Sequence, residues 1–198
     1  MEVKLLHNTP LEISDLAISK CWNKNSGEQV NEERMHRVGN KFKHSSTLEH
    51  ITYNFDIDGI SRACLQELAR HRMANLSVKS SRYTLKELKD AINIKSFIVQ
   101  TNNEEVDRQN LFRLNVLQDL LLTESMSNDI AKYMLPEAYK TSLVWTINMR
   151  SLQNFLKLRT DKSALWEIRK LAYSIYNQLP ESHRFMFTEF IYKESNED

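Results

Sequence analysis

Glycine and proline are scarce in this chain of 198 residues, which has three of each. Because both residue types punctuate turns, their scarcity favours long helices over a fold of many short strands. Only two cysteines occur, Cys21 and Cys64, and both lie in stretches of apolar periodicity. We expect them to be buried thiols of a reducing compartment, and a disulfide framework is disfavoured.

An excess of charge of one sign is also missing, since the formal net charge is +1. The net charge therefore indicates neither a nucleic acid nor a membrane as a partner. No apolar run is long enough to span a bilayer, and the N-terminal residues lack the long apolar segment of a signal peptide. The expected location is the cytoplasm. The length fits one domain, which we assign to residues 1–198.

The periodicities that are present belong to both helices and strands. Ile51, Tyr53, Phe55 and Ile57 alternate with polar residues, which predicts a strand over 50–59 with one solvent-facing side. Further strands are expected at residues 1–6 and 141–148. Helices are predicted at residues 11–22, 31–43, 61–72, 104–123, 127–135, 151–159 and 165–179. Residues 77–84 are expected to be extended, and 86–103 irregular. The pattern predicts an α+β fold, a small antiparallel sheet surrounded by helices.

The densest polar cluster is the run Arg70-His71-Arg72, followed by Ser80 and Arg82. Guanidinium groups bind phosphate oxygens in bidentate geometry, so this cluster is a candidate anion site. In an extended segment, Ser80 and Arg82 would point the same way and form a clamp. A solvated basic turn at a helix C-terminus explains the local pattern equally well.

A second cluster, residues 44–50, precedes the alternating strand. His44, Glu49 and His50 could bind a metal, and a metal-dependent hydrolase is therefore one alternative function. Their spacing matches none of the common helical zinc motifs and no cysteine lies nearby, which favours a polar loop.

A third cluster follows the strand at 141–148. Ser151 is the expected N-cap of the next helix, while the amides of Asn148 and Asn154 can read the edge of a ring. On a helix, Arg159 lies about 140° around the axis from Asn154, so one ligand is not expected to touch both. Two ligands or two subunits would fit better, and an ordinary capped surface helix is the alternative.

These three clusters, in this order, resemble the motifs of the flavin-dependent thymidylate synthases. The Arg-His-Arg run with a serine after seven residues reads RHRMANLSVKS, a His-containing loop ends in Glu-His before a strand, and the third motif reads NMRSLQNFLKLR. The resemblance spans residues 44–159. It implies reductive methylation of deoxyuridine monophosphate (dUMP) to dTMP, with bound FAD, 5,10-methylenetetrahydrofolate as carbon donor and NADPH as reductant of the flavin. It also implies a homotetramer whose active sites are assembled from several subunits.

Carried over residue by residue, the resemblance assigns FAD to nine side chains: His44, Ser46, Glu49, Arg70, His71, Arg72, Asn148, Arg150 and Asn154. It assigns the nucleotide to five: Glu67, Ser80, Arg82, Lys132 and Arg159. A guanidinium near the uracil carbonyls can stabilise negative charge on the ring, which makes Arg159 the candidate catalytic residue together with Ser80. No base is visibly paired with Ser80, so its expected contribution is binding. Neither cysteine is needed as a nucleophile, and no metal is implied.

The chain departs from the family pattern at a few positions. Lys132 stands where Arg is common, which keeps the charge but loses the bidentate fork. Glu67 stands where Gln is common, and a carboxylate beside a bound anion is unfavourable unless it accepts from a donor. Met149 replaces a usual Ala, and Val78-Lys79 replaces a more acidic stretch.

One further class remains open from the residues alone, a helical nucleic-acid-binding module. Its basic residues would be Arg70, Arg72, Lys79, Arg82, Lys86 and Lys89. The near-neutral total charge weighs against such a module.

Overall fold

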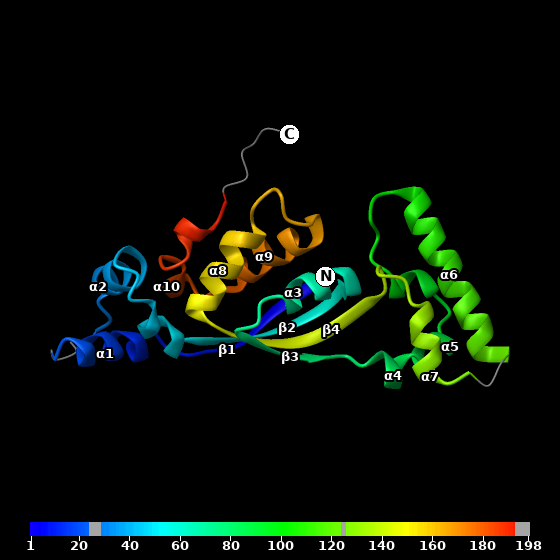
Figure 1. The fold of residues 1–198 in the computed structure, drawn as a ribbon, viewed down its shortest axis with the longest axis horizontal. Coiled ribbons are helices and arrows are strands. Elements are labelled where there is room, and N and C mark those ends of the chain that lie inside the picture. Colours follow the sequence, from blue (N-terminus) through cyan, green and yellow to red (C-terminus); the bar gives the residue numbers. More distant parts are fainter. Residues whose placement is uncertain (24–28, 124–125, 193–198) are drawn as a thin grey trace.

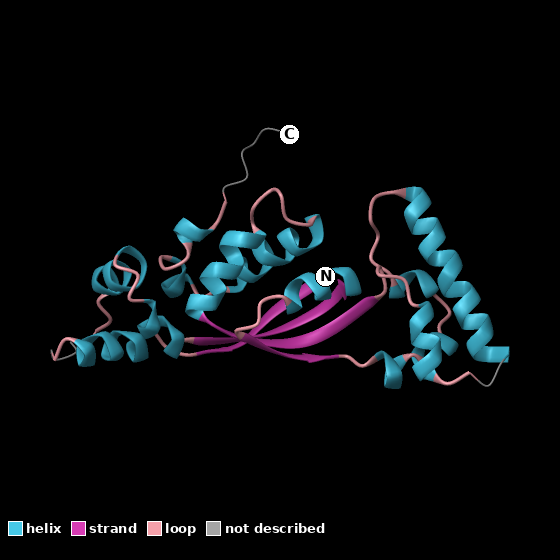
Figure 2. Ribbon diagram, viewed as in Figure 1, coloured by secondary structure: helices cyan, strands magenta, loops and turns pink. Residues whose placement is uncertain are grey.

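The computed structural model describes residues 1–23, 29–123 and 126–192. Part of the polar stretch after the first helix therefore lies outside the described residues. Within them, the strands form an antiparallel sheet in the order β1-β2-β4-β3 (Figures 1 and 2). Their bounds are β1 Glu2–Asn8, β2 Thr52–Ser61, β3 Ala74–Val78 and β4 Lys140–Asn148. The predicted α+β class with a small antiparallel sheet is confirmed.

The helices form three groups around this sheet, as Figure 1 shows. One face of the sheet is covered by α3 Arg62–Ala69, α8 Met149–Arg159 and α9 Trp166–Gln178, with α10 Glu181–Arg184 beside them. At one end of the molecule lie α1 Glu12–Cys21 and α2 Glu32–His36, which continues into a π-helical turn at Arg37–Lys41. At the other end lie α4 Ser81–Thr84, α5 Lys86–Lys89, α6 Glu104–Thr123 and α7 Asn128–Ala131.

The alternation predicted for β2 is confirmed. Tyr53, Phe55 and Ile57 are fully buried, while the polar residues between them face outward. The strand runs beyond Gly59, because a bulge between Asp58 and Ile60 shifts the register and returns Ile60 to the buried face. Gly59 allows this with a φ of 74°, a conformation that costs glycine little.

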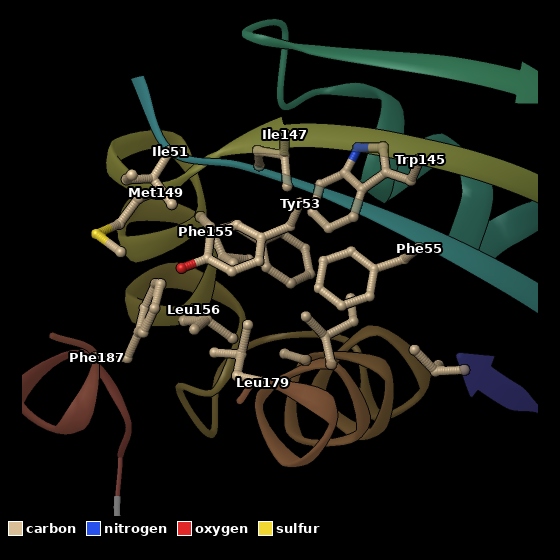
Figure 3. Packing of buried hydrophobic residues seen from close by; sticks show 14 of the residues in the cluster. Ile51, Tyr53, Phe55, Trp145, Ile147, Met149, Phe155, Leu156, Leu179 and Phe187 are labelled. Carbon is tan, nitrogen blue, oxygen red and sulfur yellow. The ribbon is translucent and has the colours of Figure 1, made fainter. Parts of the chain in front are cut away.

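The main core lies between the sheet and its helices and is rich in aromatic rings. Trp145 contacts Phe55 and Phe155, with ring centroids 6.2 and 5.0 Å apart, and Tyr53 stacks beside Phe55 (Figure 3). Each such buried ring contributes about 1.5–3 kcal/mol relative to its exposed state. These rings fix the positions of β4 and α8, which carry part of the candidate site.

A second, smaller cluster of buried residues is formed by the helices at the far end of the sheet. Leu114, Leu117 and Leu121 line one side of α6 and pack with Leu85 and Leu88. The two clusters lie within one chain, and the assignment of residues 1–198 to a single domain stays a prediction.

Several local expectations were wrong. The segment 77–84 is not extended throughout, because β3 ends at Val78 and α4 begins at Ser81. Ser80 and Arg82 therefore do not share one face of a strand. Residues 86–103 include a helix and a short 3₁₀ turn rather than being wholly irregular. Of the two free thiols, Cys64 is buried as expected, but Cys21 is exposed at the end of α1.

None of the described helices combines the length and the apolar composition needed to cross a membrane.

Candidate active site

The register of the sheet brings the three sequence motifs together. Ala74, the first residue of β3, lies opposite Ile147 near the end of β4. The turn Arg70–Met73 therefore lies beside the start of α8. The backbone N–H of Met149 also donates to the carbonyl of Ile51 at 2.8 Å, which ties the loop before β2 to the same helix. Segments separated by about a hundred residues thus meet at one place.

A cavity of about 660 Å³ opens at this meeting point. Its lining consists of Glu49, Arg70, His71, Arg72, Met73, Arg150, Ser151, Asn154, Leu158 and Arg159. Seven of these were candidate site residues. Met73, Ser151 and Leu158 were missed, although Ser151 and Leu158 lie three and four positions from Asn154 and so share its helix face.

The cavity is lined by an excess of positive charge. Arg70 and Arg72 are exposed side chains on the turn before β3. Arg150 forms an ion pair with Glu49, with 2.6 Å between Nη1 and Oε1, and both side chains stay about half exposed. An exposed pair of this kind contributes little stability and can rearrange for a ligand. The cationic lining suits phosphate oxygens.

His71 links the cavity to the main core. Its ring meets Phe155 edge to face with centroids 4.9 Å apart, and its Nε2 accepts a hydrogen bond from Arg159 Nε at 3.0 Å. Burial, together with the positive charges of Arg159 and Arg70, lowers the pKa of His71 to about 4. The imidazole is therefore neutral at neutral pH.

Asn148, not Ser151, is the N-cap of α8. The Asn148 Oδ1 accepts a hydrogen bond from the backbone N–H of Ser151 at 2.8 Å, which satisfies one of the free amides at the helix start. The expectation that Ser151 caps the helix was wrong, since the extended backbone at Asn148 places the cap three residues earlier. The side-chain oxygen of Asn148 is therefore used to cap α8.

Two other expectations concern residues at or near the cavity. His44 and Ser46 are exposed and, among the described residues, do not belong to the cavity lining. Asn154 and Arg159 border one cavity, and the expectation that two different ligands contact them stays a prediction. Arg159 is long enough for its guanidinium to reach His71 from the end of the helix.

The metal alternative gains no support from the geometry. Across the residues that the structure describes, no three His, Cys, Asp or Glu side chains gather closely enough to hold a metal ion. Glu49, which that alternative required, is paired with Arg150.

Three of the nucleotide candidates, Ser80, Arg82 and Lys132, lie beyond the other end of β3. Four residue steps separate Ala74 from Val78, or about 13 Å at the rise of a strand, and α4 follows. There Arg82 forms a bidentate ion pair with Asp129 of α7, in which Nη2 and Oδ2 are 3.0 Å apart. This hydrogen-bonded pair lowers the pKa of Asp129. Lys132 lies one helical turn beyond Asp129 and adds positive charge there.

Glu67 is separate from this second cluster. Its carboxylate forms an ion pair with Arg159, with 2.9 Å between Oε2 and Nη1, and a longer one with Arg70 at 3.4 Å. The chain therefore holds two groups of candidate residues, one around the cavity and one around α4 and α7.

Comparison with known proteins places the chain in a family. The family model described as "Thymidylate synthase complementing protein" matches residues 4–183. A flavin-dependent thymidylate synthase of Wolinella succinogenes is 54% identical over 199 residues, which cover 94% of this chain and 97% of that protein. One from Helicobacter pylori strain ATCC 700392 is 47% identical over 204 residues, which cover 96% and 98%.

The fold has a counterpart among solved structures. The crystal structure of thymidylate synthase X from Helicobacter pylori with FAD and dUMP superimposes with a TM-score of 0.92 at 45% identity, covering 98% of this chain and 100% of that one. Together with a cavity built from the three ordered motifs, these matches establish the family. The chain is an enzyme that belongs to the flavin-dependent thymidylate synthases.

Proposed function

We propose that this enzyme binds FAD in the cavity between the Arg70–Met73 turn and α8 and converts dUMP to dTMP. The observation that carries the proposal is the convergence of the Arg-His-Arg run and the third motif on one cationic cavity of about 660 Å³. The Helicobacter pylori structure with FAD and dUMP supports the choice of ligands.

The residues present fit a dinucleotide flavin. Arg70 and Arg72 offer exposed guanidinium groups for a pyrophosphate. Asn154 offers an exposed amide for polar atoms on a ring edge, and Met73 and Leu158 provide apolar surface for a flat ring. His44 and Ser46, which lie outside the cavity, remain proposed flavin residues from the resemblance, as does Asn148.

The bound flavin would supply the hydride that completes the methyl group, after reduction by NADPH and with methylenetetrahydrofolate as carbon donor. The protein's own part is to bind and orient the reactants and to stabilise charge. Arg159, at the inner edge of the cavity, would place its permanent positive charge beside the uracil carbonyls as negative charge develops there.

Ser80, Arg82 and Lys132 are proposed to bind the nucleotide from a different subunit. Within one chain they lie beyond the far end of β3, whereas Arg159 and Glu67 border the flavin cavity. An assembly in which one subunit's α4 region faces another's cavity would unite both groups, which supports the proposed homotetramer. We propose the cytoplasm as its location.

The first test is the visible spectrum of freshly purified protein. A flavin spectrum that changes on addition of dUMP is the expected result. A colourless protein that neither gains a flavin spectrum with added FAD nor forms dTMP would refute the proposal.

Two substitutions then separate the two ligands. Arg72→Ala removes a phosphate contact and should weaken FAD retention about 10- to 100-fold, the range for one charge-assisted hydrogen bond. Arg82→Ala should weaken dUMP binding by a similar factor and leave FAD retention nearly unchanged. Arg108→Ala, in an exposed pair with Glu105 on α6, is the matched control. Equal loss of both ligands in Arg82→Ala would contradict the assignment.

A further inference from the structure

The Arg159 guanidinium is held by two residues of the segment that ends α3. Its Nε donates to His71 Nε2 at 3.0 Å, and its Nη2 donates to the backbone carbonyl of Glu67 at 3.2 Å. Its Nη1 lies 2.9 Å from Glu67 Oε2 in an ion pair. The side chain of Arg159 is only 14% exposed, so these contacts are shielded from water far more than a surface pair is.

Two of the five N–H groups of the guanidinium are thus used in hydrogen bonds, and Nη1 faces the Glu67 carboxylate in the ion pair. The remaining N–H groups of the terminal nitrogens can donate to oxygens of a planar ligand. Arg159 borders the cavity, so a ligand bound there can reach these remaining N–H groups. The orientation of the guanidinium is thus determined before a ligand arrives.

The same contact assigns the tautomer of His71. Arginine has no acceptor, so Nε2 of His71 must accept and the neutral ring carries its proton on Nδ1. The low pKa of His71 agrees with a neutral ring at this place. The edge contact with Phe155 holds the ring plane, so the acceptor that faces Arg159 is itself fixed by the core.

Glu67 is the unusual member of this network. Its carboxylate is 30% exposed beside a site lined by arginines, where a bound anion would be repelled by it. Contacts with Arg159 and Arg70 offset this repulsion. The condition set by the sequence, that a carboxylate here must accept from a donor, is met by two guanidinium groups.

We propose that Glu67 is a positioning residue, which acts with His71 to orient Arg159 and leave the remaining N–H groups of its terminal nitrogens for the substrate ring. The link to the reaction rests on the proposed function, whereas the orientation itself concerns only the chain. Positioning of this kind raises the rate of the chemical step more than it strengthens substrate binding.

The activity test compares Glu67→Ala with Glu67→Gln. Glu67→Ala removes the side-chain acceptor and should lower kcat about tenfold or more, while KM for dUMP changes by less than about threefold. Glu67→Gln keeps an oxygen that can face the same guanidinium nitrogen and should restore most of the rate. Glu105→Gln, which alters an exposed pair on α6, is the control. Wild-type kcat in a folded Glu67→Ala variant would overturn the proposal.

A second measurement observes the wild-type protein and does not depend on activity. In ¹⁵N-edited spectra of the wild-type protein, with Arg159→Lys used for assignment, the Nε–H of Arg159 should exchange with water far more slowly than that of the exposed Arg108. The Nδ1 of His71 should show the shift of a protonated nitrogen. An Arg159 Nε–H that exchanges as fast as the Arg108 one would overturn the proposal. If wild-type protein forms no dTMP but these signals are protected, the proposed function fails and the positioning stands.

Discussion

The two ends of β3 hold their functional candidates in different ways. At its start, His71 and Arg159 are connected to an aromatic core through Phe155, and Arg159 is 14% exposed. At its end, Arg82 and Asp129 pair on the surface of a smaller, leucine-rich cluster, and both are 55% exposed. Shielded contacts are stronger and less adaptable than solvated ones. The cavity side is therefore preorganised within one chain, while the exposed pair on the α4 side can adapt to a ligand.

The largest effect is expected from Phe155→Ala. This ring is fully buried between Trp145 and His71, so its removal should cost about 3–5 kcal/mol in the free energy of unfolding. The support of His71 is lost at the same time, and FAD retention should fall. Urea unfolding and the flavin spectrum measure both effects. Val144→Ala, on the open face of the same sheet, should change neither by much.

The corresponding change in the smaller cluster is Leu117→Ala. It should cost about 2–5 kcal/mol and loosen α6 against α4 and α5. Binding of dUMP should weaken while FAD retention stays near that of the wild type, as hydrogen exchange and equilibrium binding can measure. Leu122→Ala, on the exposed side of α6, is the control. Loss of FAD in Leu117→Ala would show that the two ends are not independent.

His71, beside the sheet, should make the free energy of unfolding depend on pH. Burial and Arg159 lower the pKa of His71 from 6.5 to about 4, so the unfolded chain binds a proton that the folded chain does not. Stability from this group is fully present above pH 6.5 and falls as the pH drops toward 4. The effect is at most about 2 kcal/mol after allowance for partial exposure.

His71→Gln should flatten the fall in urea midpoint between about pH 6.5 and 4 without abolishing it. Part of the slope should remain because burial also lowers the pKa of His183. No histidine occurs from residue 72 to 182, so local unfolding of the α4–α7 region should lack the histidine contribution to this slope. An unchanged slope in His71→Gln would contradict the neutral, buried imidazole.

The smallest effect concerns helix caps. Asn148 caps α8 with its side chain, whereas the residue at the same position before α7, Ser127, makes no such bond. Asn148→Ala should cost about 1 kcal/mol, and Ser127→Ala much less. Thermal unfolding of the two variants would show whether capping, like charge burial, differs between the two ends. Equal shifts in Tm would remove this distinction.

Most of the fold was predictable from periodicity. The α6 bounds at Glu104–Thr123 and the alternation in β2 follow from local patterns because each element buries one face of its own. The course of residues 77–84 could not be predicted in this way. A short polar segment carries no periodicity that would distinguish the end of a strand from one turn of helix. The exposure of Cys21 likewise depends on what packs against α1.

The residue types of the candidate site were determined by the sequence alone, in the Arg-His-Arg run, the loop ending in Glu49-His50 and the run from Asn148 to Arg159. Only the tertiary structure decided which of them meet. The antiparallel pairing of β3 with β4 places Arg70–Met73 beside α8 and carries Ser80 and Arg82 away from it. It also turns Glu67 toward Arg159. Spacing along a chain sets the reach of neighbours a few residues apart, whereas contacts across ninety residues depend on sheet register and on the free energy of burying the core.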